Sequence, residues 1–549
     1  MHQIGNLSAE INKPKGLYLA GPGLIMDAMN PPSSEDILEL GQEELPDLVK
    51  AVEESPLSSR HKAIILTMIQ QLSQTTKLNH EKMAELRRIK RLLGKKTEKG
   101  NRRGTPDEPS PPKKNHGRNG VDDYQFANVV HYPHHLKCGD ECPGCAHGTL
   151  QGIAPRRIIR LKGNAPITAE LHQPERLRCS GCGEIFTAEL PPEVGDEKAD
   201  ASAKALVAVF RYGMGIPHYR LAAMQQALGV PLPASTQYEM VEMLWTQVVP
   251  IYKELLNQAA GWPLFFVDDT TGKILDLMKD KEARKAAKER VGIFTTGIIA
   301  RNNGREIHFF FTGRKHAGEN LGELLTRRDQ ALPAPLQVSD ALSRNVPKDH
   351  LTVLVLCLVH GRRNFYDCDE AFPDETTYVI ERIALVYRNE RHIRKEGLND
   401  QQRLEYHQAN STEPMEEIRT YGQQKLDSKE IEPNGVLGHA FEYMINHWQG
   451  MTQFLRIPGA PLDNNDVERL IKRSIMHRKN SLFYKNENGA QVGDVLMSLI
   501  QTCIASGANP FDYLTILQKH SRNAAKNPHL WLPWNYQQIL RSLGSPPSG

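Results

Sequence analysis

Hydrophobic positions form a first helical pattern near the N-terminus of this chain of 549 residues. Between Ile65 and Leu93, apolar residues recur at alternating four- and three-residue steps, as in a heptad seam that a few polar residues interrupt. This spacing predicts a helix over residues 61–99 with a basic end. The helix either pairs with a second copy as a short coiled coil or packs against its own protein. Residues 1–60 lack such a period and are rich in Pro, Gly, Ser and acids, so we expect a loosely ordered extension.

A second helical pattern covers residues 193–258. Short breaks that contain Gly or Pro separate its three stretches, which are ASAKALVAVFRYGMG, YRLAAMQQALG and ASTQYEMVEMLWTQVVPIYKELL. Such breaks between amphipathic helices permit a helix-turn-helix arrangement. We therefore expect a helical region with a helix-turn-helix-like arrangement.

The pattern then changes to that of strands. Short β-rich runs with turn residues between them are PLFFVD, TGKILDL, VGIFTTGIIA and EIHFFFT. After them, AGENLGELLTRRD predicts a helix, PLQVSD a strand, HLTVLVLCLV a buried strand and GRRNFYDCDEAF the start of a helix. This order predicts a mixed sheet flanked by helices.

The predicted fold is therefore multidomain α+β. We expect the sheet domain to begin at 259–372, to be interrupted by a polar helical insertion at 373–450, and to resume at 451–510 with a helix that carries an acid near its start. Residues 511–549 are expected to form a C-terminal tail.

Composition limits the kind of protein. The chain is 39% hydrophobic and 24% charged, as in ordinary globular proteins. No apolar run reaches the ~18–20 residues of a membrane span, and the first residues lack the apolar core of a secretory signal. We expect a cytoplasmic protein without a membrane partner.

Charge is concentrated in one segment, although the formal net charge is only +3. Nine Lys and Arg residues between Arg87 and Arg103 face one acid, Glu98. Such a run is typical of a solvated, flexible segment and also of a nucleic-acid contact. Residues 100–124, rich in Pro, Gly and charge, read as a linker.

Cysteines are concentrated within residues 125–192. Two C-x-x-C pairs, Cys142 with Cys145 and Cys179 with Cys182, have the spacing of the two knuckles of a tetrahedral zinc site. Strand-like residues between the pairs indicate a zinc ribbon with a structural Zn²⁺, because all four positions are filled by protein. Buried free cysteines are the alternative, and nearby residues could replace a ligand; these are Cys138, His134, His135 and His147.

Three carboxylates occur where a sheet domain could bring them together. Asp268 and Asp340 each end an apolar strand, and Glu468 lies in the first turn of a helix for which Asp463 is the expected N-cap. Glu468 is also at the edge of that helix's apolar stripe, so its side chain can point into a cleft. Phosphodiester cleavage with two metal ions needs carboxylates that converge from separate elements. Each acid alone also has a purely structural explanation. Asp268 could start a turn, Asp340 could cap the short helix ALSRN, and Glu468 could be a favourable first-turn acid on the helix dipole.

These residues resemble the bacterial transposases of the insertion-sequence sixty-six family, within the DDE superfamily, over about residues 85–535. The resemblance lies in RLLGKKTEK, CPGC with CSGC, GIPHYRLAAMQQALGV, VDDTTGKIL, CLVHGRRNF, PLDNNDVERLIKRSIMHRKNSLFYKNENGA and WLPWNY. It gives Asp268 and Glu468 the roles of first and last catalytic acid. In LQVSDALSRN, one register places Ser339 at the second acid and the other places Asp340 there. We choose Asp340, because Ser would leave the metal ions short of a ligand. Asp269 stands where the family usually has Glu.

The resemblance implies an RNase H-like catalytic domain with two Mg²⁺ or Mn²⁺ ions per active site. It also implies binding to the terminal inverted repeats of an insertion sequence and to target DNA as at least a dimer, in the bacterial nucleoid, with accessory proteins of the same element possible. His360 is a candidate for orienting the scissile phosphate or a catalytic water, unless it is only bonded locally at a helix start.

Candidate DNA contacts, for which a solvated helix face is the alternative, are Tyr219, Arg220, Arg362, Arg363, Arg469, Lys472, Arg473, Arg478 and Lys479. The competing hypotheses are a DNA-binding regulator with an inactive sheet domain and a metal-dependent nuclease without strand transfer.

Overall fold

The computed structural model describes residues 45–71, 82, 137–140, 143, 149, 166–178, 185–189, 191 and 197–544. Contacts divide the chain into two compact units, Met1–His80 and Glu81–Gly549. In the first unit, α1 (Leu45–Glu54) is followed by helical residues 59–71. Part of the expected N-terminal extension is therefore helical, whereas most of the predicted helix over 61–99 lies outside the described residues.

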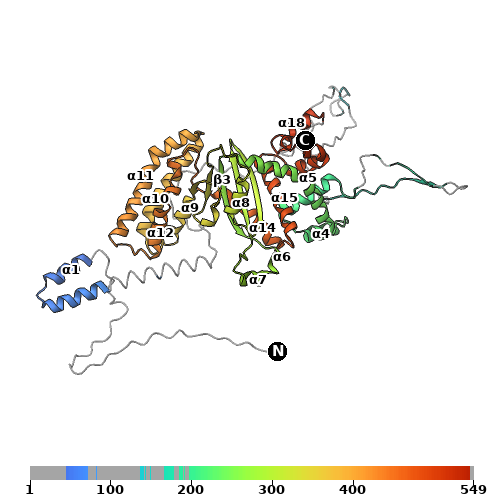
Figure 1. Cartoon of the computed structure of the whole chain (residues 1–549). Helices are drawn as coiled ribbons and strands as arrows, with labels where there is room; N and C mark the ends of the chain where they lie inside the picture. Colours follow the sequence, from blue (N-terminus) through green and yellow to red (C-terminus); the bar gives the residue numbers. More distant parts are fainter. Residues whose placement is uncertain are drawn as a thin grey trace, which may run out of the picture. The chain divides into compact units, whose positions relative to one another are not determined.

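A five-stranded mixed sheet is the centre of the second unit (Figure 1). Its order is β5 (Arg305–Gly313), β4 (Phe294–Asn302), β3 (Leu264–Thr271), β6 (Leu336–Ser339) and β7 (Val353–Leu356). The β3–β4 and β4–β5 pairs are antiparallel, and the β3–β6 and β6–β7 pairs are parallel. The predicted mixed sheet flanked by helices is confirmed.

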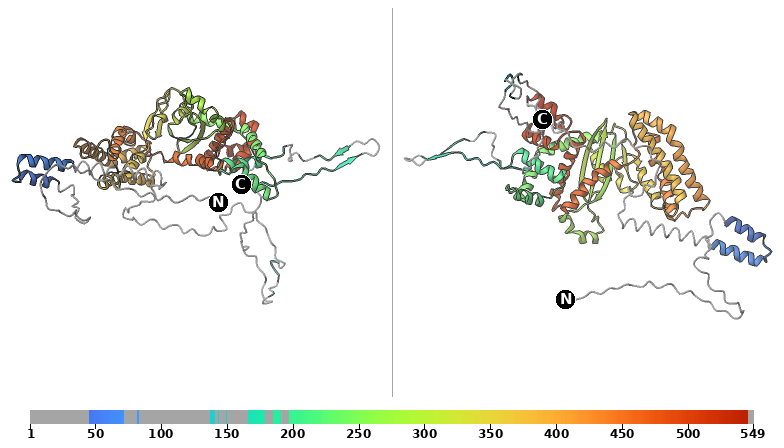
Figure 2. Two further views of the ribbon diagram at one scale, coloured as in Figure 1. Left: turned by 90° about the horizontal axis from the view of Figure 1, so that it is seen from below. Right: turned by 180° about the vertical axis from the view of Figure 1, so that it is seen from behind.

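Helices lie at both ends of this sheet (Figures 1 and 2). Three helices form a bundle at one end: α10 (Pro373–Glu396), α11 (Asp400–Asp427) and α12 (Val436–Asn446). The helices predicted within 193–258 lie toward the other end and are α3 (Ala201–Ala208) with a π-helical continuation (Val209–Gly213), α4 (His218–Ala227) and α5 (Ala234–Ala260). The remaining helices near the sheet are α6 (Leu275–Met278), α7 (Lys281–Ala286), α8 (Ala317–Leu325), α9 (Leu358–Tyr366), α13 (Trp448–Met451), α14 (Asn465–Ser481) and α15 (Glu487–Ala505).

The C-terminal stretch that we expected to be a tail is instead folded. It forms α16 (Pro510–Lys519), α17 (Ser521–Lys526) and α18 (Tyr536–Ser542). Tyr513 and Trp531 are fully buried in the main core, and the Tyr513 hydroxyl donates to the Trp531 carbonyl at 2.6 Å. Burial of such large rings stabilises the fold substantially, so the prediction of a tail was wrong.

Two strand predictions also need correction. TGKILDL is not a strand beyond Thr271, because Ile274 forms only an isolated bridge with Tyr484 and α6 begins at Leu275. The apolar run HLTVLVLCLV contributes only four residues to β7. Its ladder ends where the Cys357 N–H donates to the Ser339 carbonyl, and α9 begins at the next residue.

Among the described residues, none of the helices combines the length and the apolar character that crossing a membrane requires.

Candidate active site

Asp268 lies in β3, and Asp340 directly follows β6, the neighbouring strand parallel to it. In the β3–β6 ladder, Phe266 pairs with Val338, and each aspartate is two residues further along. Because side chains alternate between the two faces of a sheet, the two carboxyl groups belong to the same face and the same edge. Ser339 is one residue out of this register. Its buried hydroxyl donates to the Asp340 carbonyl oxygen at 2.9 Å.

Asp340 also has the local contacts of a turn residue. Its Oδ1 accepts hydrogen bonds from the Leu342 N–H at 3.3 Å and from the Asn345 side-chain amide. These bonds fix the carboxyl group in place. The expectation that Asp340 caps the short helix is not met, because Leu342 is the N-cap of the 3-10 helix Ser343–Asn345. Asp340 instead accepts bonds within the turn, close enough to Asp268 for its charge to raise that residue's pKa.

Glu468 approaches from α14, whose first turn is bonded to the end of β3. The Asn464 side-chain amide donates to the Val267 carbonyl at 3.0 Å, and the Asn464 N–H donates to the Cys357 thiol sulfur at 3.3 Å. Asn464, not Asp463, is the N-cap, and the Asp463 carboxylate accepts from the Asn465 N–H at 3.1 Å instead. The Asn464 side chain binds the strand because a buried amide and a buried backbone carbonyl both need a hydrogen-bond partner. This bond sets where Glu468 lies relative to Asp268.

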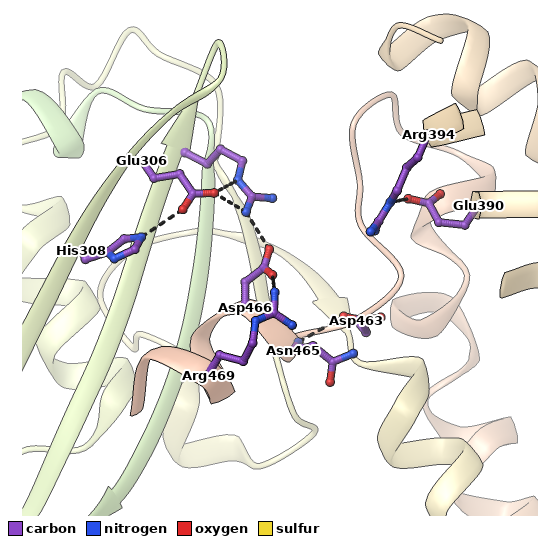
Figure 3. A network of polar contacts seen from close by, with 9 residues as sticks. Glu306, His308, Glu390, Arg394, Asp463, Asn465, Asp466 and Arg469 are labelled. Carbon is purple, nitrogen blue, oxygen red and sulfur yellow. Dashed lines mark hydrogen bonds and ion pairs between the residues drawn. The ribbon is translucent and has the colours of Figure 1, made fainter. Parts of the chain in front are cut away.

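A second bond between α14 and the sheet runs through Arg301. Its guanidinium group donates to Asp466 at 2.6 Å and to Glu306, and it lies 4.6 Å from the centre of the Phe266 ring. Figure 3 shows Asp466 directed toward the strand residues on one side and toward Arg469 on its own helix. The first turn of α14 is thus bonded to both β3 and β4.

Gly297 lets α14 pack closely against the sheet. It pairs with Asp268 across the β3–β4 ladder, and a Cβ at this position would lie 2.8 Å from the Ile471 Cγ1 and 3.4 Å from the Val467 Cγ2. Both of these α14 side chains are buried. The missing side chain of Gly297 therefore allows the helix that carries Glu468 to approach Asp268.

We expect Gly297→Ala to destabilise the protein by about 1–3 kcal/mol, the usual cost of overpacking a core. Denaturant unfolding measures the change. The matched control is Gly313→Ala, since no atom lies within 4 Å of a Cβ built there. Equal effects of the two substitutions would contradict the close approach of α14.

Burial and neighbouring charges act on Asp268. Burial is the largest cause that raises the pKa of Asp268, to about 7, and the negative charges of Asp340 and Glu468 raise it further. The Asp269 N–H, which donates to Asp268 Oδ1 at 2.8 Å, opposes this rise. A carboxyl group with so high a pKa holds a proton unless a cation replaces it.

This raised pKa predicts a pH-dependent stability cost. The unfolded carboxyl titrates near 3.8 and the folded one near 7, so the folded state is penalised progressively as pH rises between these values. Without Mg²⁺, Asp268→Asn should be more stable than the wild type at pH 8 by on the order of 2–4 kcal/mol. The difference should shrink to roughly 1–2 kcal/mol at pH 5 and vanish only below about pH 3.8, where the unfolded carboxyl group is protonated too.

Denaturant unfolding at pH 5 and pH 8 measures this difference, in Mg²⁺-free buffer without chelator so that any bound zinc stays in place. Equal differences at both pH values would show that the pKa of Asp268 is not raised.

His360 and Cys357 extend the site on the side of Glu468. The His360 Nε2 lies 4.0 Å from Glu468 Oε1, and the ligand atoms of Cys357, His360 and Glu468 all lie within 4.8 Å of one another. Within the described part of the chain, this is the one group of three such ligands. The carboxylate oxygens of Asp268, Asp340 and Glu468 therefore do not all lie within 4.8 Å of one another. The imidazole makes no hydrogen bond to its own helix; its Nδ1 is buried without a partner among the described residues. The locally bonded reading of His360 is therefore not supported.

A cavity of about 500 Å³ opens beside Asp340 and His360. The bundle contributes Tyr443 to its lining, and α9 contributes Arg363. Burial is the main cause that raises the pKa of Tyr443 to about 12, so this hydroxyl stays protonated. The cavity thus places one predicted acid, Asp340, beside the cation of Arg363 and the neutral hydroxyl of Tyr443.

Asp269 has a different role from its neighbour. Its side chain is only 3% exposed, and it contacts His316 Nδ1 at 3.0 Å and an Arg344 guanidinium nitrogen at 3.5 Å. These contacts join the end of β3 to the start of α8 and to the segment after β6. Asp269 therefore fixes the strand end from which Asp268 projects.

The predicted DNA contacts occupy varied environments. Arg478 donates to the backbone and side chain of Thr271, Arg469 pairs with Asp466, and Arg362 lies 5.8 Å from the centre of the Tyr387 ring. Lys472, Arg473 and Lys479 are exposed on α14. On α4, the exposed Tyr219 accepts a hydrogen bond from Arg220 at 3.1 Å.

Cys142, Cys145, Cys179 and Cys182 lie outside the described residues, as do His134, His135 and His147. Cys138 is exposed. The zinc site therefore stays a prediction.

Sequence reasoning missed three residues that build the site. Asn464 was part of the Asp-Asn-Asn motif, but its role as a strand contact has no local signal. Gly297 could have been noticed as a glycine inside an apolar strand, which often marks a close approach. Arg301 gives no signal for its contact with α14, because its partner there, Asp466, is distant in the sequence.

Comparison with known proteins gives both a family and individual relatives. The family described as "Transposase IS66 family" matches residues 197–492. Three proteins of Sinorhizobium fredii (strain NBRC 101917 / NGR234) are similar. "Uncharacterized protein y4jD" is 27% identical over 385 residues, which is 66% of this chain and 71% of that protein. "Uncharacterized protein y4qI" is 24% identical over 61% of this chain and 62% of its own length. "Uncharacterized protein y4hP" is 22% identical over 60% of each. The alignments with y4qI and y4hP thus cover less than two thirds of the length of those two proteins.

Proposed function

Since this chain belongs to the IS66 family of transposases, we propose that it cleaves and rejoins DNA at the ends of an insertion sequence. In this proposal, Asp268, Asp340 and Glu468 are the acids of the DDE site. The observation that supports this assignment most is geometric: the β3–β6 register and the bond from Asn464 to Val267 direct Asp268, Asp340 and Glu468 toward one end of the sheet. Burial raises the pKa of Asp268, and the charges of Asp340 and Glu468 add to that rise.

The chemistry of the donor set fits hard divalent cations. All three groups are carboxylates, which suit Mg²⁺ or Mn²⁺. Burial, and to a lesser degree the charges of Asp340 and Glu468, raises the pKa of Asp268, and a bound cation would oppose both effects. Two such ions would activate a water or a DNA 3′-hydroxyl for attack and stabilise the leaving oxygen. The thiol of Cys357 suits softer metals, so its partner in this proposal is the Asn464 N–H.

The other site residues position these groups. Asn464 and Arg301 hold the first turn of α14 on the sheet. His360, next to Glu468 and in the cavity wall, is placed to orient the scissile phosphate or a water. No Ser or Tyr nucleophile is needed, because the attacking groups are water and the DNA 3′-hydroxyl.

The rest of the proposal follows the family. The sheet, with three antiparallel strands followed by two parallel ones, supports an RNase H-like catalytic domain over 259–372 and 451–510, with the bundle of α10 to α12 inserted. We assign residues 125–192 to a zinc-binding domain with a structural Zn²⁺ and 193–258 to DNA binding. The chain would act on inverted repeats and target DNA as at least a dimer, in the bacterial nucleoid.

An in vitro reaction tests this function. The full chain is incubated with Mg²⁺, labelled DNA that carries the ends of its element, and a target plasmid. Joined products are expected. Cut ends without joining would replace the proposal with a nuclease, and bound but intact DNA would replace it with a regulator.

A further inference from the structure

The chain turns sharply where α14 ends, at Leu482. Its φ of +69° and ψ of −45° are unusual for a residue with a side chain. The Phe483 N–H donates to the Ser481 carbonyl across it at 2.8 Å. These features define a classical γ-turn, which is rare and strained. A branched residue held in such a conformation points to a functional use of the turn.

This turn presents two apolar side chains to solvent. Leu482 is 63% exposed and Phe483 is 40% exposed. The next residue, Tyr484, faces the opposite way: its ring stacks against His477 at 5.1 Å and is packed in the interior. The turn therefore leaves Leu482 mostly exposed and Phe483 partly exposed.

Bonds on both sides hold the turn in place. On the helical side, the Asn480 amide donates to the Gly215 carbonyl at 3.0 Å, and the Arg211 guanidinium group donates to the Ser481 hydroxyl. On the other side, the Tyr484 N–H donates to the Lys273 carbonyl at 2.9 Å. The two apolar side chains are thus carried on a fixed support.

The exposed charged residues that flank the turn are mostly basic, with Glu487 as an exposed acid beyond it. Lys472 and Lys479 are exposed on α14, and Lys485 is exposed just after the turn. Helical geometry places Lys472 and Lys479, four and eleven residues after Glu468, on the side of the helix that carries Glu468. Exposed lysines thus lie between the acidic site and the two apolar side chains of the turn. Duplex DNA complements this surface, because it is a polyanion with an apolar interior.

We propose that Leu482 and Phe483 form a wedge that enters the base stack of the bound DNA and unstacks one step. Apolar side chains of this type kink duplexes in that way. The proposal rests on the proposed function, because it takes the DNA to run along α14. From Glu468 to the turn the helix extends about 20 Å, or roughly six base pairs of duplex. The wedge therefore acts about one half-turn of DNA away from the cleaved phosphate.

Fluorescence of 2-aminopurine tests the wedge directly. The base is placed singly at about four to eight base pairs from the cleaved bond, and the full chain is added. We expect emission to rise at one of these positions with the wild type and at none with the double variant Leu482→Ala, Phe483→Ala. Leu351→Ala, which alters an equally apolar side chain that is 88% exposed elsewhere, should behave like the wild type.

A second variant separates the wedge from the fold. Leu482→Gly removes the side chain but favours the positive φ of the turn, so its thermal midpoint should not fall. We expect the Gly variant also to lose the emission and to cleave about tenfold more slowly. A mismatch at the responsive base pair should restore its cleavage, because that step is already unstacked.

Two results would overturn the wedge. One is unchanged emission and cleavage in both variants. The other is a change in the oligomeric state of the DNA-free variants while the emission is retained. Leu482 and Phe483 would then be a self-association surface. A wild type that unstacks DNA but joins no ends would leave the wedge standing and reject the transposase function instead.

Discussion

Replacing Asp268 or Glu468 with Ala is expected to abolish DNA cleavage while binding to the element ends survives. Each substitution removes a ligand from a site whose work is to stabilise charge on the attacking and leaving oxygens, so a loss of about 10³-fold or more is expected. Glu468 lies at the edge of the buried face of α14, not in its core, and Asp268→Ala relieves repulsion. The loss should therefore not come from unfolding.

The measurements are the cleavage rate with Mg²⁺ and the affinity for labelled ends in the same buffer. Glu487→Ala is the matched control, since Glu487 is also an acid in the first turn of a helix but is exposed. Cleavage at the wild-type rate by either site variant would reject the assignment of that acid.

The second acid has a sharper test, because two adjacent residues compete for the role. Asp340→Ala is expected to reduce cleavage by about 10³-fold or more, whereas Ser339→Ala should change it less than about threefold. The reason is the register of β6, in which Asp340 and not Ser339 shares the face of Asp268. The Ser339 hydroxyl is buried and bonded to a backbone carbonyl.

The comparison of these two variants serves as its own control, because both change the same strand end. A large loss of cleavage with Ser339→Ala and full activity with Asp340→Ala would contradict this choice. Ser339, not Asp340, would then occupy the position of the second acid.

Local patterns predicted the sheet where residues alternate or form continuous apolar runs. The runs that became β3 to β7 were predicted from such patterns, and so was the helix that carries Glu468. TGKILDL failed because its apolar residues suit a strand but its partner is the distant Tyr484, which supplies only one bridge. The prediction of a C-terminal tail failed for a related reason. The burial of Tyr513 and Trp531 depends on helices that are far away in the chain.

The candidate site was predictable only in part. Glu468 could be found from an extended motif and Asp268 from a strand end, but no local pattern could choose between Ser339 and Asp340. The pairing of Phe266 with Val338 favours Asp340, and that pairing is a property of the folded sheet. The same holds for Gly297 and Asn464, whose roles depend on where α14 packs.

The most direct test of the account is anomalous diffraction from crystals of the full chain bound to an element end and soaked in Mn²⁺. The account predicts two Mn²⁺ peaks about 3.5–4 Å apart, with oxygen ligands from Asp268, Asp340 and Glu468. A single peak held by Cys357, His360 and Glu468, with Asp340 uninvolved, would contradict it.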